Sequence, residues 1–265
     1  MYMSSNAIEV KVTGTAGTIV LNRPDYGNAL TRSMVQQLVE AIDDLYLEKR
    51  VRAIILTGAG DAFSVGSDLS EMQASQGADE AEAQEEWGAD AADFRDLLLR
   101  MLEVTKPIIA AVNGPALGAG AALVAACDLV VAGETATFGL PETRHGMVAG
   151  LAAPLFCFRL GAGQAARLLL AGATIDAVEA HRIGVFHELT ATDTVWVRAM
   201  QLAEECAAGA PEAIQLTKRL LNETMGESLA TQLAAGAVMA ATARTTEAAE
   251  EGIAALVEGR KPEWK

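Results

Sequence analysis

The sequence has few cysteines, histidines and aromatic residues. Among its 265 residues there are three cysteines and three histidines, and aromatic side chains make up 5%. Cys127, Cys157 and Cys206 lie far apart, and their spacing matches neither a metal motif nor a redox motif. We therefore predict inert thiols in a reducing compartment, the cytoplasm, and we predict no metal site.

Basic residues are also scarce. The chain has 20 lysines and arginines against 35 aspartates and glutamates, which gives a formal net charge of −15. Nucleic-acid binding depends on clustered positive side chains that neutralise phosphates, so no nucleic-acid partner is expected. A small ligand that carries a phosphate is compatible with this balance, because a few cations or backbone N–H groups are enough to bind it.

One long stretch lacks charge altogether. Pro107–Cys127 contains no charged residue and is long enough to suggest a membrane span. However, Asn113-Gly114-Pro115 interrupts it and Asp128 follows it, which favours buried segments of a globular protein. The first seven residues, Met1–Ala7, lack the cationic and apolar regions of a secretory signal, so we expect neither export nor a membrane partner.

Residue patterns in the first part of the chain predict strands that alternate with a helix. Residues 8–12 and 18–22 read as a hairpin, and 52–57 as a buried strand. Between them, Thr31 can cap a helix whose apolar residues recur at helical spacing. A strand, a helix and a strand in this order favour parallel pairing through a right-handed crossover.

The remaining chain continues as an α/β domain and ends in helices. Short apolar runs between chain breakers predict further strands at 108–112, 127–131 and 186–189. The acidic, alanine-rich segment Met72–Asp90 has few large apolar residues and is predicted to be a poorly packed surface segment. From Thr192 onward the pattern is helical. We therefore predict one domain, with a core over 1–195 and a helical C-terminal region over 196–265.

A glycine-rich turn is the first candidate for chemistry. The apolar run Ile108–Val112 leads through Asn113-Gly114-Pro115 to a small-residue helix start at Leu117–Gly120. Small residues allow a ligand to approach the backbone, and a helix N-terminus offers unpaired N–H groups to an oxygen that becomes negative during a reaction. Glu142, among apolar neighbours, is then the candidate acid/base.

Several motifs occur in a fixed order over most of the chain. They are Leu21-Asn22-Arg23-Pro24, Asn28-Ala29-Leu30, Ala62-Phe63-Ser64-Val65-Gly66-Ser67-Asp68-Leu69, Val112-Asn113-Gly114-Pro115-Ala116-Leu117-Gly118-Ala119-Gly120, Phe138-Gly139-Leu140-Pro141-Glu142, Gly161 and Arg182-Ile183-Gly184. With these motifs the chain resembles the enoyl-CoA hydratase/isomerase (crotonase) superfamily. The resemblance implies a spiral of ββα units with a helical C-terminal trimerisation region, a homotrimer or hexamer, and an acyl-CoA thioester substrate. It implies no cofactor beyond the coenzyme A of that substrate.

The resemblance also assigns the catalytic groups. The backbone N–H groups of Ser67 and Ala119 are expected to bind the thioester oxygen, and Ala119 stands where the family usually has glycine. Glu142 matches the family's second glutamate, whereas Ala122 stands in place of the first. Because a 1,3 proton shift needs one base and hydration benefits from two carboxylates, double-bond isomerisation is favoured. Enoyl-CoA hydration in acyl-CoA catabolism and non-catalytic acyl-CoA binding are the alternatives.

Further residues are expected to contact the substrate, its coenzyme A or both. Together with the catalytic groups, the resemblance assigns to this set Arg23, Ala29, Ser64, Gly66, Ser67, Asp68, Leu69, Gly114, Leu117, Gly118, Ala119, Pro141, Glu142, Lys261 and Trp264. Lys261 and Trp264 belong to a C-terminal segment that often comes from a neighbouring subunit in this family. Asp68 is also explained as a helix cap with Glu71 in a capping box, and Asp128 as structural. His145 is the competitor of Glu142 as the base, although a satisfied structural role is preferred for it, and the role of Arg144 stays open.

Overall fold

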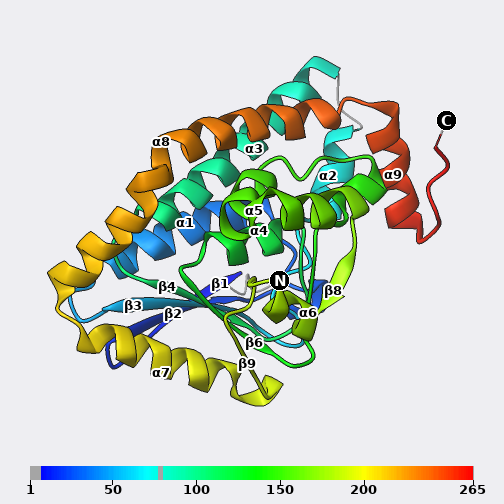
Figure 1. Cartoon of the computed structure of the whole chain (residues 1–265). Coiled ribbons are helices and arrows are strands. Elements are labelled where there is room, and N and C mark those ends of the chain that lie inside the picture. The colour runs from blue at the N-terminus through cyan, green and yellow to red at the C-terminus, as the bar shows by residue number, and fades with distance from the viewer. Residues whose placement is uncertain (1–6, 77–79, 265) are drawn as a thin grey trace, which may run out of the picture.

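The computed structural model describes residues 7–76 and 80–264, and a six-stranded sheet runs through it (Figure 1). Its strand order is β1-β2-β3-β4-β6-β9. The strands are β1 (Ile8–Thr13), β2 (Ala16–Leu21), β3 (Ala53–Gly58), β4 (Ile108–Val112), β6 (Leu129–Gly133) and β9 (Glu188–Thr190). β1 pairs with β2 in antiparallel fashion and every later pair is parallel, which confirms the predicted hairpin and parallel pairing.

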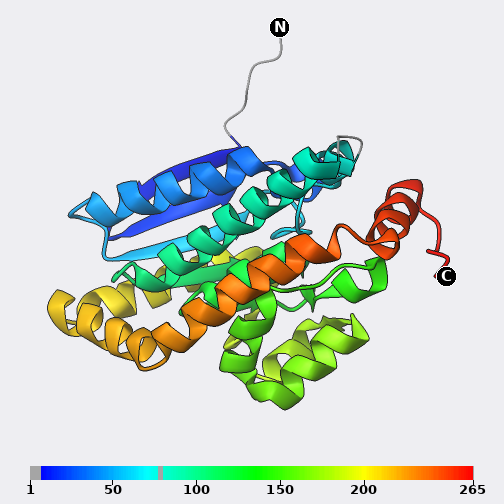
Figure 2. The same ribbon diagram turned by 90° about the horizontal axis from the view of Figure 1, so that it is seen from above.

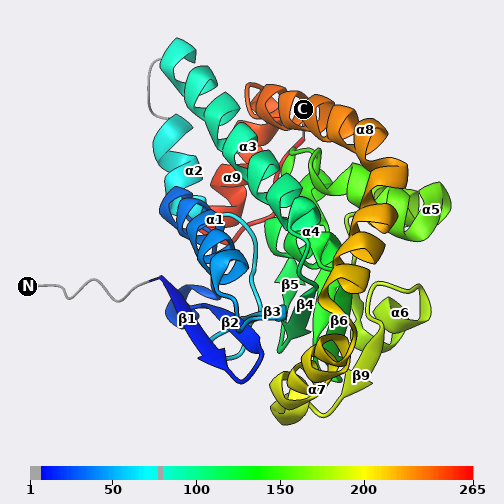
Figure 3. The ribbon, with the colours of Figure 1, turned by 90° about the vertical axis from the view of Figure 1, so that its left-hand side faces the viewer.

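Alternate residues of the central strands face two separate layers of helices. In β3, Ile54 and Leu56 belong to the larger core, whereas Ile55 belongs to a second cluster. Helices α1 (Arg32–Leu47), α3 (Glu80–Glu103) and α4 (Ala119–Ala126) cover the first face, and α7 (Val195–Ala208) covers the other (Figure 3). Successive side chains of a strand point to opposite faces of the sheet. Because helices cover both faces, the residues on both faces are apolar.

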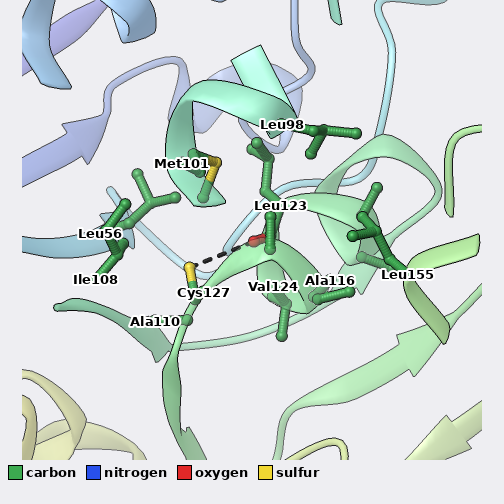
Figure 4. Packing of buried hydrophobic residues seen from close by; sticks show 14 of the residues in the cluster. Leu56, Leu98, Met101, Ile108, Ala110, Ala116, Leu123, Val124, Cys127 and Leu155 are labelled. Atoms are coloured by element: carbon green, nitrogen blue, oxygen red, sulfur yellow. Dashed lines mark hydrogen bonds between the residues drawn. The ribbon is translucent and has the colours of Figure 1, made fainter. Parts of the chain in front are cut away.

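Helix α4 lies in the middle of the larger core. Figure 4 shows Leu123 and Val124 of this helix between side chains of β3, β4, α3 and α5. Cys127, directly after the helix, donates its Sγ–H to the Leu123 carbonyl at 3.3 Å. The predicted strand at 127–131 therefore begins two residues late, because Cys127 still caps α4 through its N–H, which binds the Val124 carbonyl. Since α4 is buried, its N-terminus is held rigidly.

A second, smaller sheet carries the chain from α4 to the loop of Glu142. It contains β5 (Ala116–Leu117), β7 (Thr137–Gly139) and β8 (Thr174–Asp176) in that order. Phe138 of β7 packs edge-on against Phe156 at 5.4 Å and Phe186 at 5.8 Å between ring centroids. These rings fix the strand that leads into the 3₁₀ helix η2 (Pro141–His145). The flanking helices are α5 (Ala152–Ala171), kinked at Gly161, and α6 (Ala177–Arg182).

The C-terminal region is helical, as predicted. Helix α8 (Pro211–Ala243) runs beside α3, and α9 (Glu247–Glu258) follows it at one end of the molecule (Figure 2). Lys218 of α8 is buried and pairs with Asp128 at 2.7 Å, and Asp128 also accepts the N–H of Ile108. Asp128 is therefore structural, as expected. The division of the chain at residue 195 stays a prediction.

The prediction of a poorly packed surface segment at Met72–Asp90 is wrong at Ala83 and Trp87, although most of the described residues around them are exposed. Helix α2 (Leu69–Gln76) and the first turns of α3 occupy it, while 77–79 lie outside the described residues. Ala83 and Trp87 are 2% and 7% exposed. Small alanines let α3 pack closely, and a single tryptophan supplies the apolar area, so a count of large apolar residues misses this buried face. Within the described ranges, no helix is both long and apolar enough to cross a membrane.

Candidate functional site

The turn around Gly66, the glycine-rich turn around Gly118 and the side chain of Glu142 line the same cavity, which has a volume of about 670 Å³. Further lining residues come from α2, α3, α8 and α9. Of the residues predicted to contact substrate, the cavity is lined by Ala29, Gly66, Ser67, Asp68, Leu69, Leu117, Gly118, Ala119, Pro141 and Glu142. Arg23, Ser64, Gly114, Lys261 and Trp264 lie outside its lining. The structure therefore gathers segments that are 113 residues apart in the sequence, from Ala29 to Glu142, around one space.

The two turns meet at Gly66 and Gly118, which both have positive φ, 107° and 54°. A Cβ on Gly66 would lie 3.5 Å from the backbone nitrogen of Ala119 and 3.2 Å from the Leu117 carbonyl. The N–H of Leu117 binds the Ser64 carbonyl at 2.9 Å, which ties the turns together. Only glycine adopts such conformations without strain and leaves the approach between the turns open.

The N–H groups of Ser67 and Ala119 are both available to a ligand. Neither group donates a hydrogen bond to any residue that the structure describes. Ala119 is the first residue of α4, where backbone N–H groups have no partner within the helix, and Ser67 follows the Gly66 turn. Two free donors beside one cavity, on turns fixed by buried structure, can bind an oxygen that gains negative charge.

Glu142 lies next to the second turn. A Cβ on Gly118 would come within 3.3 Å of its Oε1, while Oε2 is buried and has no hydrogen-bond partner among the described residues. Burial raises the pKa of Glu142 to about 7. A carboxyl with such a pKa exchanges a proton readily near neutral pH, as a general acid/base requires. Pro141 fixes the start of η2, and Leu140 and Phe138 before it are fully buried.

Two other residues of the cavity wall, Ala122 and His145, affect which side chain can act as the catalytic base. Ala122 is 1% exposed and lines the cavity with a methyl group where a glutamate would bring a second carboxylate. His145 also lines the cavity, and its Nδ1 is buried without a partner among the described residues. Burial and the nearby Arg144 lower the pKa of His145, which favours the neutral form of its ring. Arg144 donates through Nε to the Ala171 carbonyl at 3.0 Å and pairs with no described carboxylate.

Asp68 and Arg23 support the first turn. Asp68 caps α2, because its Oδ1 accepts the N–H groups of Ser70 at 3.0 Å and Glu71 at 3.3 Å. The predicted capping box is wrong in its second half, since the Glu71 carboxylate binds the N–H of Arg32 instead. Burial raises the pKa of Asp68, but the hydrogen bonds from Arg23, Glu71 and Ser70 outweigh it and lower the pKa overall.

Residues outside the cavity lining hold the turns in place. Arg23 binds both Asp68 at 2.8 Å and the Ala29 carbonyl at 2.6 Å. The Ser64 hydroxyl bonds to the Asn28 carbonyl, and a Cβ on Gly114 would come within 2.0 Å of the Asp61 carbonyl oxygen. These contacts explain why glycine and serine stand at these positions in the motifs, because a larger side chain would separate the turns.

The C-terminal tail lies away from the cavity in this chain. Trp264 is 51% exposed, and Lys261 also lies outside the cavity lining. The C-terminal segment instead contributes Leu256 of α9. Helix α9 also packs on η2, because a Cβ on Gly252 would come within 2.1 Å of the His145 carbonyl oxygen. The helix thereby supports the loop that carries Glu142.

Sequence reasoning missed the polar residues that α3 and α8 bring to the cavity. Trp87, Asp90 and Arg244 all line it. The segment of Trp87 and Asp90 was expected at the surface. A signal for Arg244 was present, since it is the one charged residue between Glu227 and Glu247. An isolated charge in an apolar helix indicates a buried polar role.

Comparison with known proteins agrees with this geometry. The family model described as enoyl-CoA hydratase/isomerase matches residues 12–265. The 2,3-dehydroadipyl-CoA hydratase of Escherichia coli is 34% identical over 249 residues, 93% of this chain and 94% of that protein. The short-chain-enoyl-CoA hydratase of Clostridium acetobutylicum is 31% identical over 264 residues, 98% of each.

Solved structures give the same result. The enoyl-CoA hydratase/isomerase of Pseudoalteromonas atlantica superimposes with a TM-score of 0.85 at 29% identity, over 98% of this chain and 100% of that one. The crotonase-like α/β fold predicted from the motifs is thereby confirmed. This chain belongs to the enoyl-CoA hydratase/isomerase family of enzymes.

Proposed function

We propose that this enzyme moves the double bond of an enoyl-CoA thioester by a 1,3 proton shift. Glu142 removes a proton from C2 of a 3-enoyl-CoA, and the electron pair of that bond delocalises onto the thioester oxygen and C4. The N–H groups of Ser67 and Ala119 stabilise the oxygen of this dienolate. The protonated Glu142 then returns the proton to C4, which yields the 2-enoyl-CoA. Atoms and charges balance, and the reaction needs no cofactor.

One observation carries the choice of isomerisation. Glu142 has a free, buried oxygen beside the two unpaired N–H groups, while Ala122 presents only a methyl group to the cavity. Proton abstraction and return can be done by one carboxylate, whereas addition of water gains from a second one that activates the water. Removal of one oxyanion-hole donor typically costs about 2.7–4 kcal/mol of transition-state stabilisation.

The test compares Glu142→Gln with the unchanged enzyme. Isomerisation of a 3-enoyl-CoA, followed by the absorbance of the conjugated product, should fall by orders of magnitude in this variant. Binding of a saturated acyl-CoA, measured by calorimetry, should persist, since the amide keeps the size of the side chain. In heavy water, the unchanged enzyme should also exchange the C2 protons of that saturated ester. Full turnover in the variant would refute the assignment of Glu142.

Hydration of a 2-enoyl-CoA is the second candidate. The two relatives described above, from Escherichia coli and Clostridium acetobutylicum, favour it, because each is named a hydratase. Incubation of a 2-enoyl-CoA with the enzyme separates the two reactions: a hydratase consumes the conjugated thioester and forms a 3-hydroxyacyl-CoA, whereas an isomerase interconverts the two enoyl esters only. If neither reaction nor proton exchange occurs while esters bind, the third candidate, a non-catalytic acyl-CoA-binding protein, is supported.

We further propose that the enzyme assembles as a trimer or a dimer of trimers in the cytoplasm. Helix α8 exposes Leu216, Leu220 and Leu221, each more than 60% accessible in the single chain, and α5 exposes Leu170. Apolar side chains of this size, gathered on helices, are typical of a subunit interface. In such an assembly Lys261 and Trp264 could contact the coenzyme A of a neighbour. Light scattering coupled to size-exclusion chromatography gives the subunit number directly.

A further inference from the structure

Unpaired polar atoms concentrate around the cavity. Four of the residues that line it each have a buried side-chain atom without a hydrogen-bond partner among the described residues: Glu142 Oε2, His145 Nδ1, Trp87 Nε1 and Arg244 Nε. Glu142 and His145 belong to η2, next to the turns at Gly66 and Gly118. The other two come from α3 and from the residue after α8, and both are N–H donors. The proposed proton shift uses the glutamate and leaves the two donors without a role.

Arg244 makes few contacts for a buried guanidinium. Its side chain is 12% exposed, and among its donors Nη2 binds the Met72 carbonyl at 3.2 Å. The contact from Nη1 to Asp90 is 3.7 Å long, beyond hydrogen-bond distance. Burial, as the largest influence, lowers the pKa of Arg244 to about 10, which reflects how incompletely the surroundings replace water around this cation.

Arg32 provides a contrast, because it lines the same cavity with its donors engaged. It binds Asp90 through Nε at 2.6 Å and through Nη2 at 3.0 Å, and its Nη1 pairs with Glu86. Asp90 is therefore already occupied by one arginine. Arg244 therefore interacts only weakly with the Asp90 carboxylate, and its remaining N–H groups are available to another acceptor.

Trp87 adds a second donor at the same place. The guanidinium carbon of Arg244 lies 5.0 Å from the centroid of the Trp87 ring, so the two side chains are in contact. Trp87 is 7% exposed and its indole N–H has no acceptor among the described residues. A buried donor without an acceptor is costly, and one in the wall of a cavity calls for a functional explanation.

We propose that Trp87 and Arg244 form a subsite for an oxygen acceptor on the acyl chain, so that the enzyme prefers acyl groups bearing a hydroxyl, carbonyl or carboxylate oxygen over plain alkyl chains. The inference rests on the proposed function, because it takes the cavity to hold an acyl-CoA with its thioester at Ser67 and Ala119. The acyl chain then extends toward α3 and α8. Glu71 and Asp93 also line the cavity, so the test includes both a charged and a neutral acceptor.

The test measures dissociation constants by calorimetry for saturated acyl-CoA esters of matched length. Each length is prepared with a terminal methyl, a terminal hydroxyl and a terminal carboxylate. At one chain length, at least one oxygen-bearing ester should bind about tenfold more tightly than the methyl ester, as one charge-assisted hydrogen bond allows. The carboxylate and hydroxyl arms show whether the acceptor is charged or neutral. Equal or tighter binding of the methyl esters at every length overturns the inference.

Two variants locate the effect. Trp87→Phe removes the N–H but keeps the ring against Arg244, and Arg244→Met removes the guanidinium; each should abolish the preference by weakening the binding of the oxygen-bearing ester more than that of the methyl ester of the same length. Arg100→Met is the matched control, since this arginine of α3 pairs with Asp43 and does not line the cavity. Circular dichroism verifies folding. A preference that survives in both variants also overturns the inference.

The same data separate this inference from the proposed function. Saturated esters are not turned over, so their binding reports on the subsite even if the enzyme is a hydratase. If esters bind without preference while 3-enoyl-CoA is isomerised, the subsite is wrong and the function stands. If an oxygen-bearing ester is preferred and no isomerisation occurs, the subsite stands and the reaction is wrong. If no ester binds, both are overturned.

Discussion

Replacement of Glu142 by glutamine should make the protein more stable while it removes activity. The carboxyl is largely buried, its Oε2 has no partner among the described residues, and burial raises its pKa from 4.5 to about 7. A raised carboxyl pKa means that the folded state holds the proton more tightly than the unfolded state. The ionised form is therefore a cost to folding, and glutamine at this position carries no charge.

The size of the effect follows from the pKa. A rise from 4.5 to about 7 corresponds to about 3 kcal/mol at 1.36 kcal/mol per pKa unit. The penalty is absent below the unfolded-state pKa, grows as pH rises from about 4.5 to 7, and is complete above the folded-state pKa. Between pH 5 and pH 8, the stability of Glu142→Gln relative to the unchanged protein should increase by about 2–3 kcal/mol.

Urea unfolding followed by circular dichroism, at pH 5 and at pH 8, measures this difference. The pH dependence is more informative than either value alone, because packing differences between the amide and the acid are common to both conditions. Glu40→Gln, an exposed residue of α1, is the control and should show no comparable change. A relative stability of Glu142→Gln that is the same at pH 5 and pH 8 would refute the reasoning that the carboxylate is desolvated in the free enzyme.

Three further predictions test other contacts. Ala122→Glu should gain measurable hydration of a 2-enoyl-CoA, assayed by loss of the conjugated thioester; no gain in a folded variant argues against the role of a second carboxylate. Lys218→Met should lower the free energy of unfolding by about 3 kcal/mol in urea titration, because Asp128, beside β4 and β6, would lose its positively charged partner. A change below 1 kcal/mol contradicts this. Gly252→Ala should reduce kcat by about tenfold or more, since its Cβ would displace the His145 carbonyl and the loop of Glu142; unaltered kcat shows that α9 does not position this loop.

The motifs predicted the fold and the two backbone turns that border the cavity. Gly66 and Gly118 have positive φ at the two turns, and a glycine in such a place is visible in the sequence. Thr31 and Asp176 cap their helices as their residue types suggest, through bonds to Met34 and Glu179. These features are local, so neighbouring residues are enough to specify them.

The remaining part of the site depends on contacts between distant segments. Trp87 and Arg244 are 157 residues apart, and no pattern near either of them reveals the other. The burial of α3 against α8 likewise depends on small residues whose packing partners lie elsewhere in the chain. Arg23 is predicted to contact the substrate or its coenzyme A, and the structure adds its bonds to Asp68 and the Ala29 carbonyl, a supporting role that becomes visible only when the loops are brought together.

The length of α8 has a consequence for how acyl preference can change. Lys218 anchors this helix to Asp128, directly before β6, and Arg244 at its far end lines the cavity; the two residues are 26 positions apart, which corresponds to about 40 Å at 1.5 Å per residue. Deleting or inserting one residue in between would turn the cavity end by about 100° relative to the anchor. Changes of specificity at this wall are therefore confined to side-chain replacement, and homologues that accept different acyl groups should keep the spacing between the two ends.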